Sequence, residues 1–339
     1  MKLFIVSAVV ASTVMGASLL QEAKNAGLKP IPANAKELNK LTSNPKNPTT
    51  ASKVELGKML YLDPRLSKSG LVSCNTCHNL GLGGSDGMTA AIGHKWKANG
   101  SHLSSPTVYN SVFYDKQFWD GRSPHLEDQA QGPIQADVEM AAPKEHVEAV
   151  VNSIPEYVNR FKKAYGKDVK IDFEKVADTI AVFERTLVTP SRYDDFLNGN
   201  KKALNAAEQK GLKTFMDKGC ASCHNGIALG GEMQAFAVIE PYKHESVGGF
   251  KGDENGMVRT PTLRNITQTA PYFHNGQIAT LTEAIKEMGK IQLGMEINDA
   301  EAAEIETFLK ALDGRMPTIT YPMLPASTAT TPKPDVIND

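Results

Sequence analysis

The stretches CNTCH, at residues 74–78, and CASCH, at residues 220–224, contain every cysteine of the chain. Cys-x-x-Cys-His is the signature of covalent c-type haem attachment. Two thiols three residues apart on a helical turn can each bond a haem vinyl group, while the adjacent imidazole reaches the iron from the proximal side. The sequence therefore predicts two haems on one chain. The attachment and ligand residues are Cys74, Cys77, His78, Cys220, Cys223 and His224.

Other uses of the four cysteines have to be weighed against haem. They could form zinc half-sites, a thioredoxin-like redox pair or two disulfides. None of these alternatives requires a histidine directly after the second cysteine in both copies. The repeated histidine therefore favours haem attachment.

The rest of the composition is that of an ordinary globular protein. The chain has 339 residues, of which 41% are hydrophobic and 22% are charged, and its formal net charge is -1. This length allows two domains. The near-neutral charge, without a run rich in Lys and Arg, argues against nucleic acid or an anionic membrane surface as a partner.

Residues 1–18 have the pattern of a secretory signal peptide. Lys2 precedes an apolar run over residues 3–15, and the small residues Gly16, Ala17 and Ser18 follow it. The run is too short to span a bilayer core of roughly 30 Å, so an export signal is favoured over a membrane anchor. Because covalent c-type haem is attached outside the cytoplasm, we expect the periplasm as the compartment, and no membrane-embedded segment in the mature protein.

Helix signals dominate the sequence. The segments 205–208, 280–283 and 298–301 each place a capping oxygen three residues before a glutamate that can reach back, so a helix is expected to begin at each. Residues 172–187 alternate apolar and charged residues with helical period. The sequence therefore predicts an all-α fold.

The surroundings of the two haem motifs indicate a duplicated unit. Each motif is preceded by a predicted helix, at 52–61 or 205–218, and is followed by a glycine-rich loop, at 81–87 or 226–231. We expect two cytochrome c-like lobes with long loops, packed against each other. The predicted divisions are an N-terminal haem domain over residues 19–190, a C-terminal haem domain over 191–315 and a polar tail over 316–339.

The sixth iron ligands would decide function, because a six-coordinate iron shuttles electrons whereas an iron with an open position can bind peroxide or oxygen. His94 follows the first motif beyond the glycine-rich loop, and Met288 lies just before Gly289 at the end of a predicted helix. Spacing alone selects neither, since the chain has eight histidines and twelve methionines.

Seven segments, in order between about residues 35 and 320, resemble the bacterial dihaem cytochrome c peroxidases. They are VELGKML at 54–60, SCNTCH at 73–78, QFWDGR at 117–122, GPI at 132–134, VEM at 138–140, RTPTLRN at 259–265 and YFHNG at 272–276.

The resemblance implies different tasks for the two haems. The N-terminal haem would be the low-potential, peroxidatic one, with His78 as proximal ligand and His94 as a distal ligand that leaves on activation. The C-terminal haem, held by His224 and Met288, would be the high-potential haem at which electrons enter. A soft, neutral thioether favours ferrous iron and raises the potential. Trp119 would lie between the haems.

The same resemblance implies that Gln129 and Glu139 line the peroxide pocket. Heterolytic O–O cleavage needs a group that takes a proton from one oxygen and returns it to the leaving oxygen, and a carboxylate can do both. Gln129 would orient the peroxide and stabilise developing charge.

A calcium ion between the lobes is also implied by the resemblance. Thr269 and Pro271 match the positions of the ligating carbonyl groups, whereas Ser104 stands where the family has asparagine. A serine hydroxyl is a poorer calcium ligand than an amide carbonyl.

The implied function is reduction of hydrogen peroxide to water with two electrons from a small donor protein, a cytochrome c or a blue-copper protein, by a homodimer. Two alternatives stay open. The dihaem oxidase that matures methylamine dehydrogenase uses a tyrosine where Met288 stands. A plain dihaem electron carrier would keep both irons six-coordinate and would have no use for Gln129 and Glu139 in a pocket.

Overall fold

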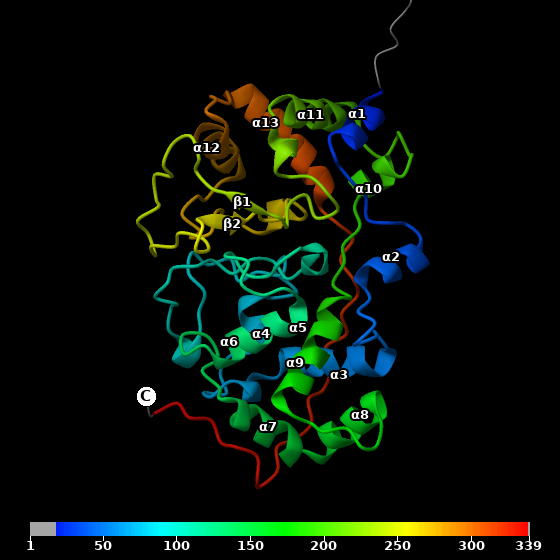
Figure 1. Cartoon of the computed structure of the whole chain (residues 1–339), viewed down its shortest axis with the longest axis vertical. Helices are drawn as coiled ribbons and strands as arrows, with labels where there is room; N and C mark the ends of the chain where they lie inside the picture. Colours follow the sequence, from blue (N-terminus) through cyan, green and yellow to red (C-terminus); the bar gives the residue numbers. More distant parts are fainter. Residues whose placement is uncertain (1–17, 338–339) are drawn as a thin grey trace, which may run out of the picture.

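Helices cluster in two lobes that are stacked along the longest axis of the molecule (Figure 1). The computed structural model describes residues 18–337, so the predicted signal peptide, except for its last residue, lies outside the described residues. Among residues 18–337 no helix is long and apolar enough to cross a membrane.

The first lobe, in the lower half of Figure 1, is built around the crossing of two long helices, α3 and α9. Gly57 of α3 lies so close to α9 that a Cβ atom there would come within 2.2 Å of the Thr179 carbonyl oxygen. The helices of this lobe are α3 (Ala51–Leu62), α4 (Cys74–Cys77), α5 (Leu126–Gln129), α6 (Gln131–Gln135), α7 (Lys144–Ser153), α8 (Pro155–Tyr165) and α9 (Phe173–Glu184); α2 (Ala35–Thr42) precedes them.

The second lobe repeats this arrangement with α11 and α13. Gly211 of α11 corresponds to Gly57, because a Cβ atom there would come within 2.1 Å of the Glu304 carbonyl oxygen on α13. In both lobes a glycine in the helix before the haem motif thus permits a close helix crossing. The helices of this lobe are α1 (Leu19–Asn25), α10 (Arg192–Leu197), α11 (Ala206–Asp217), α12 (Leu281–Leu293) and α13 (Asp299–Leu309).

The predicted helix starts are found, but the fold is mostly helical rather than strictly all-α. Asn205 and Asn298 exchange reciprocal capping bonds with the glutamates three residues later, and Thr280 accepts from the backbone N–H of Glu283. The second lobe also contains an antiparallel ribbon of two three-residue strands, β1 (Met233–Ala235) and β2 (Met257–Arg259). Strands this short leave no alternating pattern in the sequence.

Short 3₁₀ turns complete the chain and carry several of the residues discussed below. They are η1 (Pro64–Leu66), η2 (His94–Trp96), η3 (Ser111–Phe113), η4 (Cys220–Ser222), η5 (Ile266–Gln268) and η6 (Lys310–Leu312).

Each end of the chain packs on a lobe to which the predicted divisions do not assign it. Ala23 and Leu28, placed by prediction in the N-terminal domain, belong to the core of the second lobe. The predicted polar tail runs back along the first lobe (Figure 1), where Leu324 packs against the core and the Asp335 N–H donates to the Lys68 carbonyl. The predicted tail is polar in composition, but its few apolar residues dock it on the first lobe.

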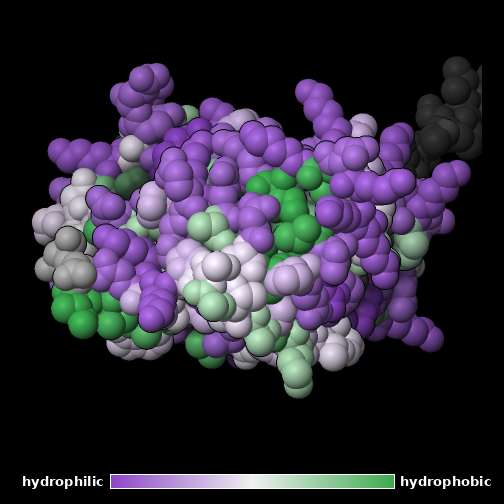
Figure 2. Space-filling model, turned by 90° about the horizontal axis from the view of Figure 1, so that it is seen from below, coloured by the Kyte–Doolittle hydropathy of each residue, from purple (hydrophilic) through white to green (hydrophobic). Residues whose placement is uncertain are grey.

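The surface at the first-lobe end of the molecule is largely hydrophilic, with small, separate apolar patches (Figure 2). This is the usual surface of a globular protein, in which scattered exposed apolar residues need no special explanation.

Candidate active site

The first haem motif forms the single turn of α4 and continues into His78. The His78 Nδ1 atom lies 2.8 Å from the Pro106 carbonyl oxygen, and the Tyr61 hydroxyl donates to the His78 carbonyl oxygen at 2.6 Å. With Nδ1 donating to a carbonyl, Nε2 is free to act as a ligand, the usual arrangement of a ligating imidazole. Burial lowers the pKa of His78, which favours the neutral, ligating form.

The side chains of the first motif line a cavity that, including its open mouth, holds about 1220 Å³ of empty space. Cys74, Cys77 and His78 stand at one wall, and neither cysteine is in a disulfide. A space of this size beside both cysteines can take a bulky group bonded to them.

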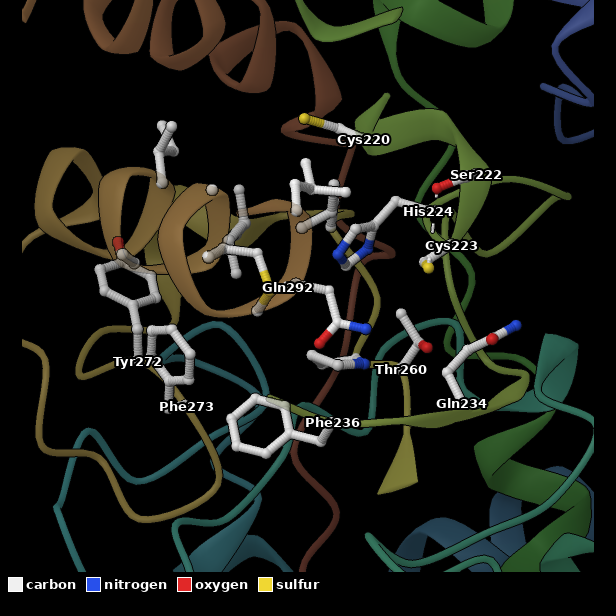
Figure 3. A pocket seen from close by; sticks show the side chains of 18 of the residues that line it. Cys220, Ser222, Cys223, His224, Gln234, Phe236, Thr260, Tyr272, Phe273 and Gln292 are labelled. Carbon is white, nitrogen blue, oxygen red and sulfur yellow. Dashed lines mark hydrogen bonds between the residues drawn. The ribbon is translucent and has the colours of Figure 1, made fainter. Parts of the chain in front are cut away.

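The second motif lines a cavity of similar size, about 1190 Å³ by the same measure. Figure 3 shows the His224 ring pointing into it, beside Cys220 and Cys223. The His224 Nδ1 atom lies 3.2 Å from the Leu229 carbonyl oxygen, and burial lowers the pKa of His224 to about 4. Met288, on α12, lines the same cavity, so the structure brings together the two predicted ligands of this haem.

Trp119 and Arg259 line both cavities and so stand between them. The Trp119 indole donates to the Ser104 carbonyl oxygen at 3.0 Å, and the Arg259 N–H donates to the Trp119 carbonyl oxygen at 2.8 Å. Trp119 is only 9% exposed. It therefore packs as a core residue while it bridges the two cavities.

Arg259 gives an independent test of whether haem fits. It is 2% exposed, its Nε donates to the Phe118 carbonyl oxygen at 2.9 Å, and its guanidinium lies over the Tyr114 ring at 4.3 Å. Its Nη1 atom is buried without a hydrogen-bond partner among the described residues. A buried cation needs a counter-ion, and a haem propionate reaching the space between the cavities would supply one. The residues present therefore fit two haems.

Gln129 and Glu139 both line the first cavity together with His78. Gln129 is the last residue of α5, and Glu139 lies in the loop after α6. Burial raises the pKa of Glu139, while the Arg122 guanidinium at the same cavity opposes that rise. The carboxyl group is thus shifted towards the protonated form, which suits a group that both takes and gives a proton.

His94 does not line the first cavity in this structure. It begins η2, outside the cavity wall, and its Nδ1 atom is buried without a hydrogen-bond partner among the described residues. Burial lowers the pKa of His94, and the neighbouring cations Lys95 and Lys68 lower it further. Lys95 and Trp96 both have positive φ, a strained conformation for residues other than glycine.

Comparisons with known proteins also indicate two haem-binding parts of the chain. A family model for di-haem cytochrome c peroxidase matches residues 51–202, and one for cytochrome c matches residues 208–313. The cytochrome c551 peroxidase of Pseudomonas aeruginosa is 44% identical over 336 residues, covering 96% of this chain and 95% of the relative. The cytochrome c551 peroxidase of Nitrosomonas europaea is 47% identical over 295 residues, which cover 84% of this chain and 87% of the relative. The chain belongs to the di-haem cytochrome c peroxidase family.

More distant relatives of this peroxidase family member include the methylamine utilization protein MauG of Methylorubrum extorquens, 33% identical over 82% of this chain and 83% of the relative. Among solved structures, a MauG-like protein associated with microbial copper homeostasis superimposes with a TM-score of 0.70 at 26% identity. The superposition covers 80% of this chain and 92% of the MauG-like protein. The two-lobe fold of this chain is therefore shared by that MauG-like protein.

Sequence reasoning missed two buried charged groups of this di-haem peroxidase, Arg259 and Glu184. Glu184, on α9, lines the first cavity, and its Oε2 atom is buried without a hydrogen-bond partner among the described residues. Burial raises the pKa of Glu184 to about 7. A glutamate on the apolar face of the predicted helix 172–187 was the available signal.

The predicted calcium ligands lie near the boundary between the lobes. Thr269 follows η5, and Pro271 comes after a cis peptide bond. The Ser104 N–H donates to the carbonyl oxygen of His274 in the second lobe, and its hydroxyl donates to the Met88 carbonyl oxygen at 3.3 Å. The Ser104 hydroxyl thus already has a partner, and calcium stays a prediction.

Proposed function

We propose that this chain reduces hydrogen peroxide to water at the first-lobe cavity, with electrons received at the second lobe. The observation that carries the proposal is the convergence of Gln129 and Glu139 on the cavity that also holds His78. When bound, each haem supplies an iron that accepts and passes on single electrons. The relatives named cytochrome c551 peroxidase support the same activity.

In this proposal Glu139 carries the proton. Its carboxylate takes a proton from one peroxide oxygen and delivers it to the other, which leaves as water. Two electrons from the donor and two protons taken up from solvent convert the remaining oxygen to a second water. The Gln129 amide donates a hydrogen bond to the peroxide and holds it in line with Glu139. That both residues line the same cavity supports these roles.

Electrons are proposed to come from a small donor protein, a cytochrome c or a blue-copper protein, in the periplasm. His224 and Met288 would set a high potential at the second lobe, and Trp119 would lie on the path to the first. Methionine at position 288 favours this peroxidase over the oxidase type, which has tyrosine there. We further expect a homodimer and a calcium ion held with the help of Thr269 and Pro271.

The direct assay of this function is consumption of hydrogen peroxide by the holoprotein with a reduced cytochrome c. We expect two electrons from the donor per peroxide. If the holoprotein consumed no peroxide with any of the reduced donors, a plain dihaem electron carrier would be the better interpretation.

We also propose that His94 is a gate, which occupies the first-lobe iron in one state and lies outside the cavity in another. Its segment, between Gly83 and Gly100, has glycines that give the chain freedom of φ and ψ. The strain at Lys95 and Trp96 is the kind of backbone strain found at switch segments. Reduction of the second-lobe haem would need a differential stabilisation of roughly 5 kcal/mol to shift such a gate almost completely.

The gate predicts a spectroscopic difference for His94→Gly. The diferric wild-type protein should show a low-spin signal at the first-lobe haem, and the variant should show a high-spin one in electron paramagnetic resonance (EPR). His102→Gly, at an exposed position of the same region that also has positive φ, is the matched control and should resemble wild type. Identical diferric spectra for wild type and His94→Gly would remove His94 from the ligand set.

A further inference from the structure

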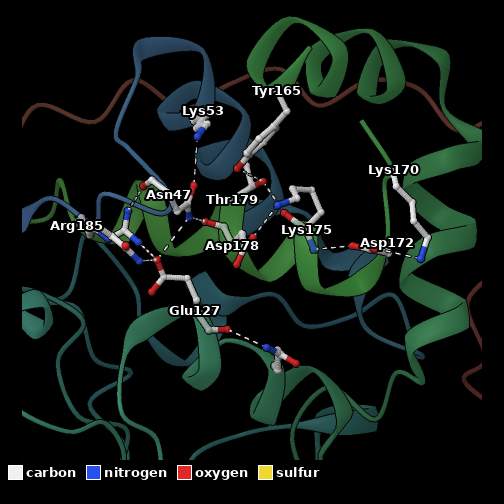
Figure 4. A network of polar contacts seen from close by, with 12 residues as sticks. Asn47, Lys53, Glu127, Tyr165, Lys170, Asp172, Lys175, Asp178, Thr179 and Arg185 are labelled. Atoms are coloured by element: carbon white, nitrogen blue, oxygen red, sulfur yellow. Dashed lines mark hydrogen bonds and ion pairs between the residues drawn. The ribbon is translucent and has the colours of Figure 1, made fainter. Parts of the chain in front are cut away.

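A buried ion pair joins two walls of the first cavity. Glu127, on α5, and Arg185, at the C-terminal end of α9, are in direct contact, and their side chains are only 8% and 4% exposed (Figure 4). Neither residue has a part in the chemistry described above. A buried pair is by itself weak evidence for a stabilising role, because apolar residues of similar volume often serve as well.

The pair is itself held by a network of side chains and carbonyl groups, and the exposed His125 ring lies 3.4 Å from Glu127 Oε2. The Asn44 amide donates to Glu127 Oε1 at 2.8 Å, and Arg185 Nη1 donates to the Asn47 carbonyl oxygen at 2.9 Å. The Asn47 amide in turn donates to the Asp178 carbonyl oxygen on α9 at 2.8 Å. Burial lowers the pKa of Arg185 to about 10, so the guanidinium is still charged at neutral pH.

Helix geometry places this pair directly behind Gln129. Glu127 and Gln129 are two residues apart on α5, and successive residues turn by roughly 100°, so their side chains leave opposite sides of the turn. Gln129 accordingly lines the cavity, while Glu127 reaches away from it to Arg185. On the other wall, Glu184 lines the cavity and its neighbour Arg185 makes the ion pair.

Four residues of helix cannot hold a side chain in place unaided. Isolated helices shorter than about 12–15 residues are marginal in water, so tertiary contacts must fix α5. Figure 4 shows Glu127 and Arg185 meeting between α5 and α9. The pair is a charged contact between these two helices.

We propose that the Glu127–Arg185 pair positions Gln129 for peroxide. The proposal rests on the function assigned to Gln129 above. Arg185 presents a rigid, planar fork, whereas lysine presents a single point charge. Arg185→Lys therefore keeps the buried charge balanced but loses the geometry that fixes the orientation of α5.

The test is a double-mutant cycle on the holoenzyme. We expect Arg185→Lys to raise the KM for peroxide roughly tenfold, because small misplacements of a positioning group have large effects, with a smaller change in kcat. In a Gln129→Ala background the same change should alter KM less than about twofold, since coupled residues are not additive.

The matched control is Arg65→Lys. Arg65 pairs with the buried Asp63 in the same lobe, and neither residue lines the cavity. This variant should leave the KM for peroxide unchanged. Hydrogen exchange supplies a readout independent of activity: the peptide containing residues 126–129 should exchange faster in Arg185→Lys and not in Arg65→Lys.

The outcomes separate the two levels of the proposal. If Gln129→Ala alone leaves KM unchanged, the function assigned to Gln129 fails. If Gln129→Ala raises KM but the effects of the two changes simply multiply, Gln129 is functional and the positioning by Arg185 is refuted. Should Arg185→Lys not yield folded holoprotein, Glu127→Gln, which keeps the side-chain shape, takes its place in the same cycle.

Discussion

Replacing Glu139 by glutamine is expected to lower kcat for peroxide reduction by roughly 10²–10⁴, the range that a positioned acid–base group contributes. Glutamine keeps the size and polarity of the side chain but cannot take up and return a proton. Peroxide should still reach the cavity, because Gln129 and the cavity walls are unchanged. The measurement is steady-state turnover of the holoprotein with a reduced donor.

The pH profile gives this prediction a second readout. Burial raises the pKa of Glu139 above its ordinary value. Because the deprotonated form accepts the first proton, wild-type kcat/KM should rise with pH as Glu139 ionises. The Glu139→Gln variant should lack this rise. Asp137→Asn, at an exposed position two residues earlier, is the matched control and should behave like wild type. Turnover of Glu139→Gln within a few-fold of wild type would show that another group moves the proton.

Replacing Met288 by histidine is expected to lower the potential of the second-lobe haem by a substantial part of the roughly 0.8 V range that axial ligands span. A thioether favours ferrous iron, whereas imidazole favours the ferric state. The haem should stay attached, because Cys220 and Cys223 are untouched. With a lower potential, electron transfer from the donor should become slower.

A spectroelectrochemical titration of the holoprotein measures this change. Met323→His is the control, since Met323 is 92% exposed and does not line the second cavity. If the titration curves of Met288→His and wild type coincide, another methionine must be the ligand.

Local signals predicted much of this fold. The Cys-x-x-Cys-His motifs, and the capping boxes that begin with Asn205 and Asn298, are encoded within a few neighbouring residues, and all lie where the sequence indicates. The duplicated unit also follows from local order along the chain. The proposed peroxide-pocket residues do not follow from local order, because Gln129 and Glu139 could be picked out only by resemblance to a family.

Features that depend on distant contacts could not be predicted in this way. Leu28 and Leu324 lie in segments whose local sequence does not indicate a lobe, and only the assembled cores determine the lobe on which each packs. Arg259 becomes notable only when β2 places its side chain between two cavities. The position of His94 outside the cavity lining likewise depends on the path of a long loop, which spacing does not encode.

The most direct test of the central claim, that the first lobe reduces peroxide with electrons passed from the second, is stepwise reduction of the diferric holoprotein. Visible and EPR spectra would be recorded at each step, and peroxide turnover would be assayed in parallel. The account predicts that the His224 and Met288 haem is reduced first, while the His78 haem stays ferric, becomes high-spin and gains peroxide turnover in proportion to that signal. Peroxide reacting instead at the haem whose spectrum is altered by Met288→His would contradict it.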